Sequence, residues 1–171
     1  MSAKFSILTK FLAVSAFSFG IGTLHGLLQV MPPVRRWLDS IGSPYGGPGH
    51  MIDPLAHAHM NLVGGVVLLA MGVTYYLLPI LTNRPIHSNR LINMTFWCTG
   101  LGAYGFYVLQ LLFGIWEGVL MHTAPEQLAD VHRYYGPTVA LSGTIMAVGF
   151  FSYVINVALT LWWPPGRPAR A

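Results

Sequence analysis

A long apolar run constrains this chain more than any other feature of its sequence. Two histidines, His57 and His59, open the run, which ends near Pro79. At about twenty residues, it is long enough for a helix to cross the hydrocarbon core of a bilayer. Only 8% of the residues are charged and 54% are hydrophobic, whereas soluble domains carry roughly 25% charged residues. The sequence therefore predicts an integral membrane protein embedded in a lipid bilayer.

Three other apolar segments bring the predicted membrane helices to four. Their expected ranges are about 11–31, 55–81, 91–120 and 134–163. Asp53 and Pro54 fit the start of the second helix, because aspartate is a common N-cap and proline is tolerated at the first helical position. No internal repeat is evident in the sequence. We therefore predict an all-α fold, a single transmembrane domain built as a bundle of four antiparallel helices.

Basic residues predict how this bundle is oriented. Four helices place both termini on one side, together with the basic residues Lys4, Lys10, Arg84, Arg90, Arg167 and Arg170. Because basic residues favour the cytoplasmic side, both termini are expected in the cytoplasm of a bacterial inner membrane. The outer side then holds the glycine-rich stretch 42–49 and residues 122–133. Topology accounts for the formal net charge of +4, and no nucleic acid partner is expected.

The spacing of the two histidines indicates that they face different partners. Residues at i and i+2 are about 200° apart on a helix, so His57 and His59 cannot chelate one metal ion together. This spacing favours haem over zinc, because haem iron accepts one imidazole from each face of the porphyrin. Five small residues are candidates for giving a porphyrin room: Gly20, Gly22, Gly26, Gly64 and Gly65.

His25 is the histidine expected to face this pair from the first helix. At 1.5 Å per residue it lies roughly 10 Å below the outer end of its helix, and His59 lies roughly 6 Å down. His25 and His59 are thus expected to meet at a similar depth, unless His25 instead hydrogen-bonds a neighbouring carbonyl. His132 is a further candidate ligand, although it also fits an interface residue at a helix start. Arg133 is a candidate for the haem propionates. Three histidines fit loop positions: His50, His87 and His122.

Four stretches of the chain resemble subunit I of the haem-copper oxidase superfamily, most closely the cbb-type oxidases and the nitric oxide reductases. His57-Ala-His59, followed by Gly64 and Tyr75-Tyr76-Leu-Leu-Pro79, resembles the family's histidine-x-histidine helix. The flanking matches are Gly22-Thr-Leu-His25-Gly, Arg90-Leu-Ile-Asn-Met-Thr-Phe-Trp97 and Arg133-Tyr-Tyr-Gly136. The resemblance covers nearly the whole chain but only the C-terminal four-helix portion of the family's subunit.

The resemblance implies roles for individual residues. In the family the first histidine of the pair binds the high-spin haem and the second binds the low-spin haem, which correspond to His57 and His59. Arg133 loosely matches the family's arginine near the propionates. The family's copper or non-haem iron ligands, and the second ligand of its low-spin haem, lie on helices without a counterpart in this sequence. His25 stands where the family's motif has glutamate, so an acid is replaced by a possible ligand.

Three functions fit these features. The first is a small cytochrome b-like membrane protein with one or two haem b groups near the outer face. It would pass single electrons to or from a cytochrome c or a quinol, with His57 or His59 paired with His25 or with a histidine of another chain. Two imidazoles leave iron no open position, so reduction of dioxygen or nitric oxide by this chain alone is not expected.

The second function is a non-catalytic or split subunit of a larger respiratory complex of the haem-copper oxidase or nitric oxide reductase type, or a homo-oligomer that completes a haem site between copies. The third is a non-redox role, as a chaperone for metal or haem or as a structural anchor. Glu117, near the outer end of the third helix, fits an interface residue better than a proton carrier.

Overall fold

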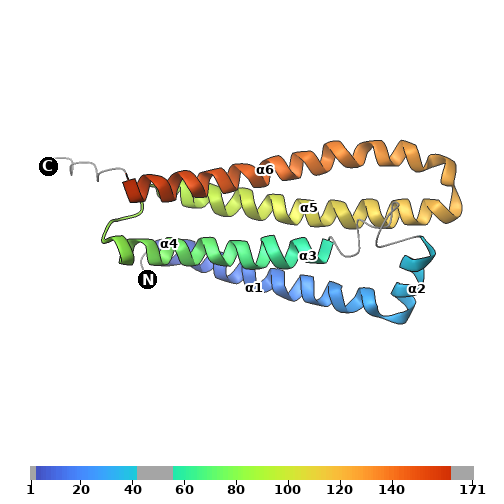
Figure 1. The fold of residues 1–171 in the computed structure, drawn as a ribbon, viewed down its shortest axis with the longest axis horizontal. Coiled ribbons are helices and arrows are strands. Elements are labelled where there is room, and N and C mark those ends of the chain that lie inside the picture. The colour runs from blue at the N-terminus through green and yellow to red at the C-terminus, as the bar shows by residue number, and fades with distance from the viewer. Residues whose placement is uncertain (1–2, 42–55, 163–171) are drawn as a thin grey trace.

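The computed structural model describes residues 3–41 and 56–162 of the chain, and within these ranges all the regular secondary structure is helical (Figure 1). The segments in chain order are α1 (Ala3–Val30), α2 (Pro32–Ser40), α3 (His57–His59), η3 (Met60–Val67), α4 (Leu68–Thr82), α5 (Asn89–Thr123), η4 (Pro125–Gln127) and α6 (Leu128–Trp162). α3, η3 and α4 follow one another without a break as a single long helix. The described residues contain four helices long and apolar enough to cross a membrane, which confirms the predicted all-α membrane fold.

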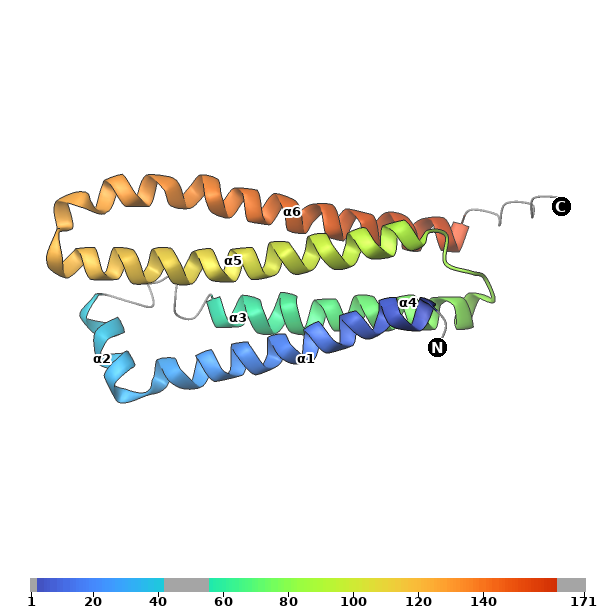
Figure 2. The same cartoon turned by 180° about the vertical axis from the view of Figure 1, so that it is seen from behind.

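The four long helices are arranged as two packed pairs (Figure 2). α1 lies along α3, η3 and α4, and α5 lies along α6. Glycines bring the second pair close together: a Cβ added to Gly149 on α6 would lie 2.5 Å from the backbone nitrogen of Thr99 on α5. Gly102 on α5 likewise meets the backbone of Met146. Only a residue without a side chain allows such an approach.

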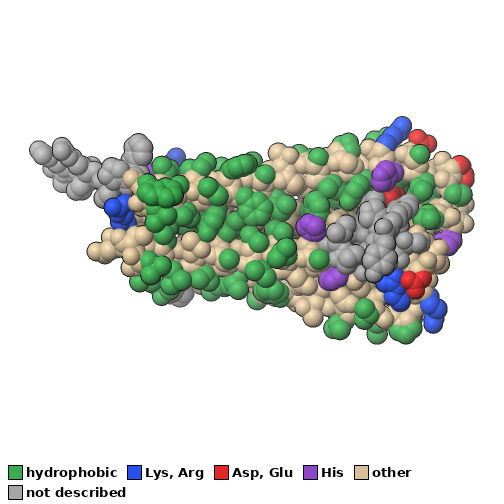
Figure 3. Space-filling model, viewed as in Figure 1, with side chains coloured by type: hydrophobic (Ala, Val, Ile, Leu, Met, Phe, Trp, Pro, Cys, Tyr) green, Lys and Arg blue, Asp and Glu red, His purple; other side chains and the backbone are tan. Residues whose placement is uncertain are grey.

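The two ends of the bundle differ in charge and in the helices that form them. We call the end at which α1 begins, α4 ends and α5 begins the basic end, because it carries Lys10, Arg84 and Arg90. The other end, where α1 ends and α2 lies, is called the α2 end. In the view of Figure 3, most of the visible histidine side chains lie in the half of the molecule towards the α2 end.

α5 and α6 extend further than the sequence suggested. α5 runs to Thr123 rather than 120, and α6 begins at Leu128 rather than 134. The turn between them is short, because Ala124 leaves helical geometry with φ −158° and Pro125 starts a single 3-10 turn. At 1.5 Å per residue α5 is about 52 Å long, well beyond the roughly 30 Å of a hydrocarbon core. The α5–α6 pair therefore projects past the start of α3 at the α2 end.

The short helix α2 was not expected from the sequence. Pro32 follows the end of α1 and also begins α2. Proline is tolerated at the first position of a helix, because the N–H that it lacks has no hydrogen-bond partner within the helix there. Leu38 and Ile41 are fully buried and pack against Trp37 and residues of α5. This stretch is thus a helix folded against the projecting part of α5. The predicted helix start at 53–55, the stretch 42–49 and His50 lie outside the described residues.

Candidate functional site

His57 meets His25 across the contact between α1 and α3. Their ring centroids lie 5.8 Å apart, with the ring planes at 72°. Gly26 lies beside this contact, where a Cβ would be at van der Waals distance, 3.4 Å, from Cδ2 of His57. The imidazoles therefore come from two different helices and meet edge to face, at the start of the helix that continues into η3 and α4.

Tyr107 on α5 is the third member of this group. Its hydroxyl lies 3.3 Å from Nδ1 of His25, and the two ring centroids are 5.7 Å apart. A hydrogen bond at one imidazole nitrogen fixes the tautomer and leaves the other nitrogen to bind a metal. With Nδ1 held by Tyr107, the nitrogen with which His25 would bind iron is Nε2.

His59 lies on a different side of the helix from His57. Its ring lies 4.6 Å from the ring of Phe106 on α5, measured between centroids. The two histidines thus diverge, as their spacing predicted. The expectation that His25 meets His59 was wrong, because the side of the helix that faces α1 carries His57, Asn61 and Gly64, whereas His59 faces α5.

The Nδ1 atom of His57 is buried and has no hydrogen-bond partner among the residues that the structure describes. Leaving a buried polar atom unpaired costs about 1–3 kcal/mol. A ligand that pairs with this atom would remove that cost. Imidazole nitrogens are ligands for iron, copper and zinc. The donor chemistry of His57, with His25 beside it, therefore fits a haem iron or another imidazole-binding metal.

The glycines expected to give a porphyrin room mostly serve helix packing. A Cβ on Gly22 would collide with the side chain of Asn61, and one on Gly64 would lie 2.7 Å from Oγ of Ser18. Gly65 is covered in the same way by a phenylalanine ring of α1. In addition, the hydroxyl of Ser15 donates to the Gly65 carbonyl oxygen over 2.7 Å. For Gly22, Gly64 and Gly65 the expectation was wrong, because side chains of the facing helix fill these gaps, whereas a Cβ on Gly20 would meet nothing within 4 Å.

His132 and Arg133 lie apart from the imidazole pair. Nδ1 of His132 is 3.0 Å from Oε1 of Glu117, whose side chain is fully buried while that of His132 is 55% exposed. Glu117 is ten residues beyond Tyr107 on α5, which corresponds to about 15 Å along the helix. Arg133 donates to the hydroxyl of Tyr134 over 2.9 Å and is paired with an aspartate of its own helix. The structure therefore gives His132 an acidic partner rather than a place beside His25.

Sequence reasoning missed Tyr107, the α5 residue whose hydroxyl lies against His25. Tyr104, Tyr107 and Gln110 recur at helical spacing on an otherwise apolar helix, and that stripe of polar groups was the available signal. Gln110 and Glu117 are buried. Within the described ranges, no three His, Cys, Asp or Glu side chains come together to hold a metal ion. Haem iron, unlike structural zinc, needs only one or two protein ligands.

Comparison with known proteins identifies the family. The model of the family "Cytochrome C and Quinol oxidase polypeptide I" matches residues 1–149. The chain belongs to this family. As a member of the polypeptide I family, it shares 28% identity over 166 residues with a cytochrome c oxidase subunit 1 homolog from Agrobacterium tumefaciens (strain T37), an alignment that covers 90% of the chain and 29% of the relative.

Two further relatives are also named as cytochrome c oxidase subunits. A cbb3-type cytochrome c oxidase subunit, CcoN1 of Stutzerimonas stutzeri, is 26% identical over 113 residues, covering 65% of the chain and 22% of the relative. A probable cytochrome c oxidase subunit 1-beta of Nocardia farcinica (strain IFM 10152) is 28% identical over 150 residues, covering 85% and 21%. The chain therefore spans less than a third of the length of these relatives and corresponds to part of an oxidase polypeptide I.

Proposed function

We propose that this chain is a haem-holding part of a respiratory oxidase assembly of the polypeptide I type, and that it passes single electrons. The observation that carries the proposal is the divergent histidine pair, in which His57 has a buried Nδ1 without a partner and faces His25. Buried polar side-chain atoms are usually hydrogen-bonded, and His57 Nδ1 is one of several among the described residues that are not. Membership of the oxidase family supports haem as the ligand rather than another metal.

Two haem b groups would use the pair as the family resemblance implies. His57 would bind one iron and His59 another, because their rings face different sides of the helix. Haem supplies a reversible one-electron change at its iron. The residues of this chain would bind and orient that group: the His57 ring lies against α1 beside Gly26, and the ring of Phe106 packs on that of His59. The remaining ligands would come from other helices of the assembly.

A second arrangement is favoured by a specific distance. His25 and His57 lie 5.8 Å apart between centroids, so both could serve one haem iron within this chain. That arrangement describes a small cytochrome b, in which two imidazoles from α1 and α3 close the iron to gaseous ligands. In this second arrangement His25 is a ligand, whereas in the two-haem arrangement it is not.

The wider setting belongs to the same proposal. The basic end carries cations and, among the described residues, no acidic side chain, which supports cytoplasmic termini in a bacterial inner membrane. The imidazoles would then lie towards the outer face, where a cytochrome c or a quinol exchanges electrons with them. A larger redox complex is the expected partner, with a homo-oligomer as the alternative.

Haem content and spectra of histidine variants test the proposal. The chain is purified from membranes in mild detergent, and reduced-minus-oxidised and pyridine haemochrome spectra are recorded for His25→Ala, His57→Ala and His59→Ala. His87→Ala, an exposed histidine at the basic end, is the matched control. A dependence of haem content on His57 and on His59 separately supports the two-haem arrangement. Loss in His25→Ala and His57→Ala alone supports the small cytochrome. Absence of haem from the wild-type chain and from every complex that co-purifies with it refutes both.

A further inference from the structure

A π-helix separates the histidine pair from the rest of its membrane helix. η3 (Met60–Val67) begins directly after His59 and is eight residues long. π-helices are rare, and most are single-turn bulges, frequently at functional sites. A π-helix of this length beside two candidate haem ligands indicates a role in directing their side chains.

The junction between η3 and α4 has one backbone carbonyl more than it has helical donors. In the π pattern, the N–H of Leu68 donates to the carbonyl of Val63, five residues earlier. α4 follows the α pattern from its N-cap Val67, whose carbonyl accepts from the N–H four residues later. Between these two bonds lie the three carbonyls of residues 64–66, but only the two N–H groups of residues 69–70. One carbonyl therefore needs a donor from outside this helix.

Ser15 on α1 supplies such a donor. Its hydroxyl donates to the carbonyl oxygen of Gly65 over 2.7 Å, and the side chain is 1% exposed, so the bond is shielded from water. Within the helix the Gly65 carbonyl shares the N–H of Leu68 with Val63. Because Gly65 has no side chain, α1 can lie this close: a Cβ there would be 2.8 Å from a ring carbon of Phe19. The π pattern is thus completed by a residue of the neighbouring helix.

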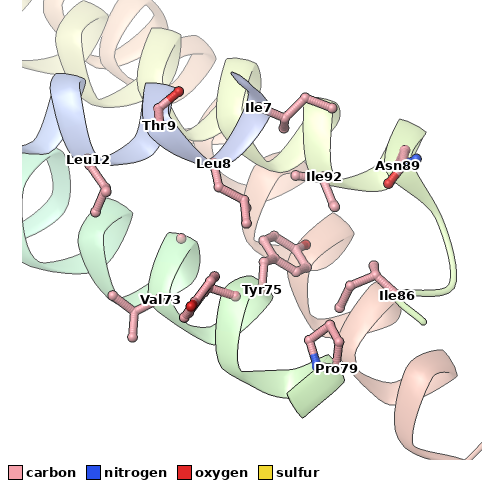
Figure 4. A pocket seen from close by; sticks show the side chains of 12 residues that line it. Ile7, Leu8, Thr9, Leu12, Val73, Tyr75, Pro79, Ile86, Asn89 and Ile92 are labelled. Atoms are coloured by element: carbon pink, nitrogen blue, oxygen red, sulfur yellow. The ribbon is translucent and has the colours of Figure 1, made fainter. Parts of the chain in front are cut away.

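α4 is fixed in its present register against α1 and α5. A Cβ on Gly72 would lie 2.7 Å from Cβ of Phe11 on α1, and the hydroxyl of Tyr75 is hydrogen-bonded to a threonine of α5 over 2.9 Å. Figure 4 shows the ring of Tyr75 directed towards Leu8 of α1 and Ile92 of α5, and these three residues line an apolar cavity of about 510 Å³. If η3 became an α-helix, the resulting turn would therefore fall on the residues before it.

The extra residue in η3 sets the directions of His57 and His59. The change from π to α bonding accommodates one residue more than an unbroken α-helix would, and one residue corresponds to about 100° around the helix axis. Without it, Ala58 would take the direction that His57 now has towards His25, and Met60 would take the direction of His59. The π geometry therefore decides whether imidazoles or other side chains point towards α1 and α5.

We propose that Ser15 is a positioning residue, whose hydrogen bond to Gly65 keeps η3 in the π form and thereby turns His57 towards His25. The part that the histidines play as haem ligands rests on the proposed function, whereas their direction can be measured without haem. Replacing Ser15 with alanine leaves the junction one donor short. The substitution should shift η3 towards an α-helix, in which carbonyls and donors pair regularly.

Thiol labelling at position 58 tests this role without haem. Ala58→Cys is introduced into the full chain together with Cys98→Ser, which removes the one natural cysteine, and its reaction with a maleimide is timed in mild detergent. Ala58 is exposed and would be covered by α1 after the turn. Ser15→Ala is compared with Ser18→Ala. Ser18 is also buried and packs against η3 at Gly64, but its hydroxyl donates to a carbonyl of its own helix over 2.8 Å.

A one-residue deletion supplies the second comparison. Removing Val66, which is 47% exposed on η3, takes away the extra residue, so that carbonyls and donors become equal in number and the Ser15 bond is no longer needed. The expected labelling is at least threefold slower in Ser15→Ala than in Ser18→Ala. In the Val66 deletion, the rate should be the same with Ser15 and with alanine at that position.

Two results overturn the proposal. Equal labelling rates in Ser15→Ala and Ser18→Ala show that the Ser15 bond does not hold the direction of the helix. Equal slowing by Ser15→Ala with and without Val66 shows a general packing effect. The two serine variants decide the question even if the deletion variant does not fold. If haem is absent from the chain and from its complexes, the proposed function fails, but the labelling rates still decide the role of Ser15.

Discussion

Replacing Tyr107 with phenylalanine is the sharpest test of how His25 would work as a ligand. The substitution keeps the aromatic ring, which lies 5.7 Å from the ring of His25, and removes only the hydroxyl 3.3 Å from Nδ1. When Nε2 binds iron, Nδ1 carries the proton and donates a hydrogen bond to the tyrosine oxygen. That bond makes the imidazole a stronger donor to iron and favours the ferric state. Its loss should therefore raise the midpoint potential.

The size of the shift follows from the hydrogen bond. A net contribution of about 0.5–1.5 kcal/mol corresponds to roughly 20–65 mV for a one-electron couple, for which a tenfold change is 59 mV. Tyr104→Phe is the matched control: it lies one turn earlier on α5 and its hydroxyl also contacts α1, at Ser18 over 2.9 Å. Potentiometric titration of the haem absorbance measures both variants.

Three outcomes would refute this reasoning. A shift in Tyr107→Phe below about 20 mV shows that the hydrogen bond does not act on a ligand. An equal shift in Tyr104→Phe shows a general packing effect rather than an effect through His25. A lower potential contradicts the assumption that Nδ1 of His25 donates the hydrogen bond to Tyr107. A haem that binds normally but does not respond to Tyr107 would leave the proposed function standing and remove His25 from the ligand set.

Two further predictions concern the α5–α6 pair. Gly149→Leu should lower the free energy of unfolding in detergent by about 1–3 kcal/mol, because its side chain meets the backbone of Thr99; Gly143→Leu, which has open space around it, should be nearly neutral. His132→Ala should lower the free energy of unfolding by about 1–3 kcal/mol, because the substitution removes a hydrogen-bond partner of the buried Glu117. Adding Glu117→Gln should recover part of that loss, and a double-mutant coupling below about 0.5 kcal/mol would contradict the pairing.

The number of helices and the divergence of the histidine pair could be predicted because both depend on local periodicity. Apolar length gave the four long helices, and the helical repeat placed His57 and His59 on different sides. The fold of Pro32–Ser40 could not be predicted, because it depends on burying Leu38 and Ile41 against α5. The extension of α6 to Leu128 was hidden for a similar reason: its polar first turns are held by α5, through Glu117 and His132, rather than by lipid.

The choice of His57 as the neighbour of His25 lay beyond the sequence, because it is set by the register between two helices. Asn61 fills the gap at Gly22, and Ser18 fills the gap at Gly64. These contacts close the interface between α1 and η3 on the side of His57 towards the basic end. The same closure limits where a cofactor can lie. A group bound by His57 cannot extend along this interface towards the basic end, because side chains occupy that path. This argues for a site near the membrane surface rather than one buried at the centre of the bilayer.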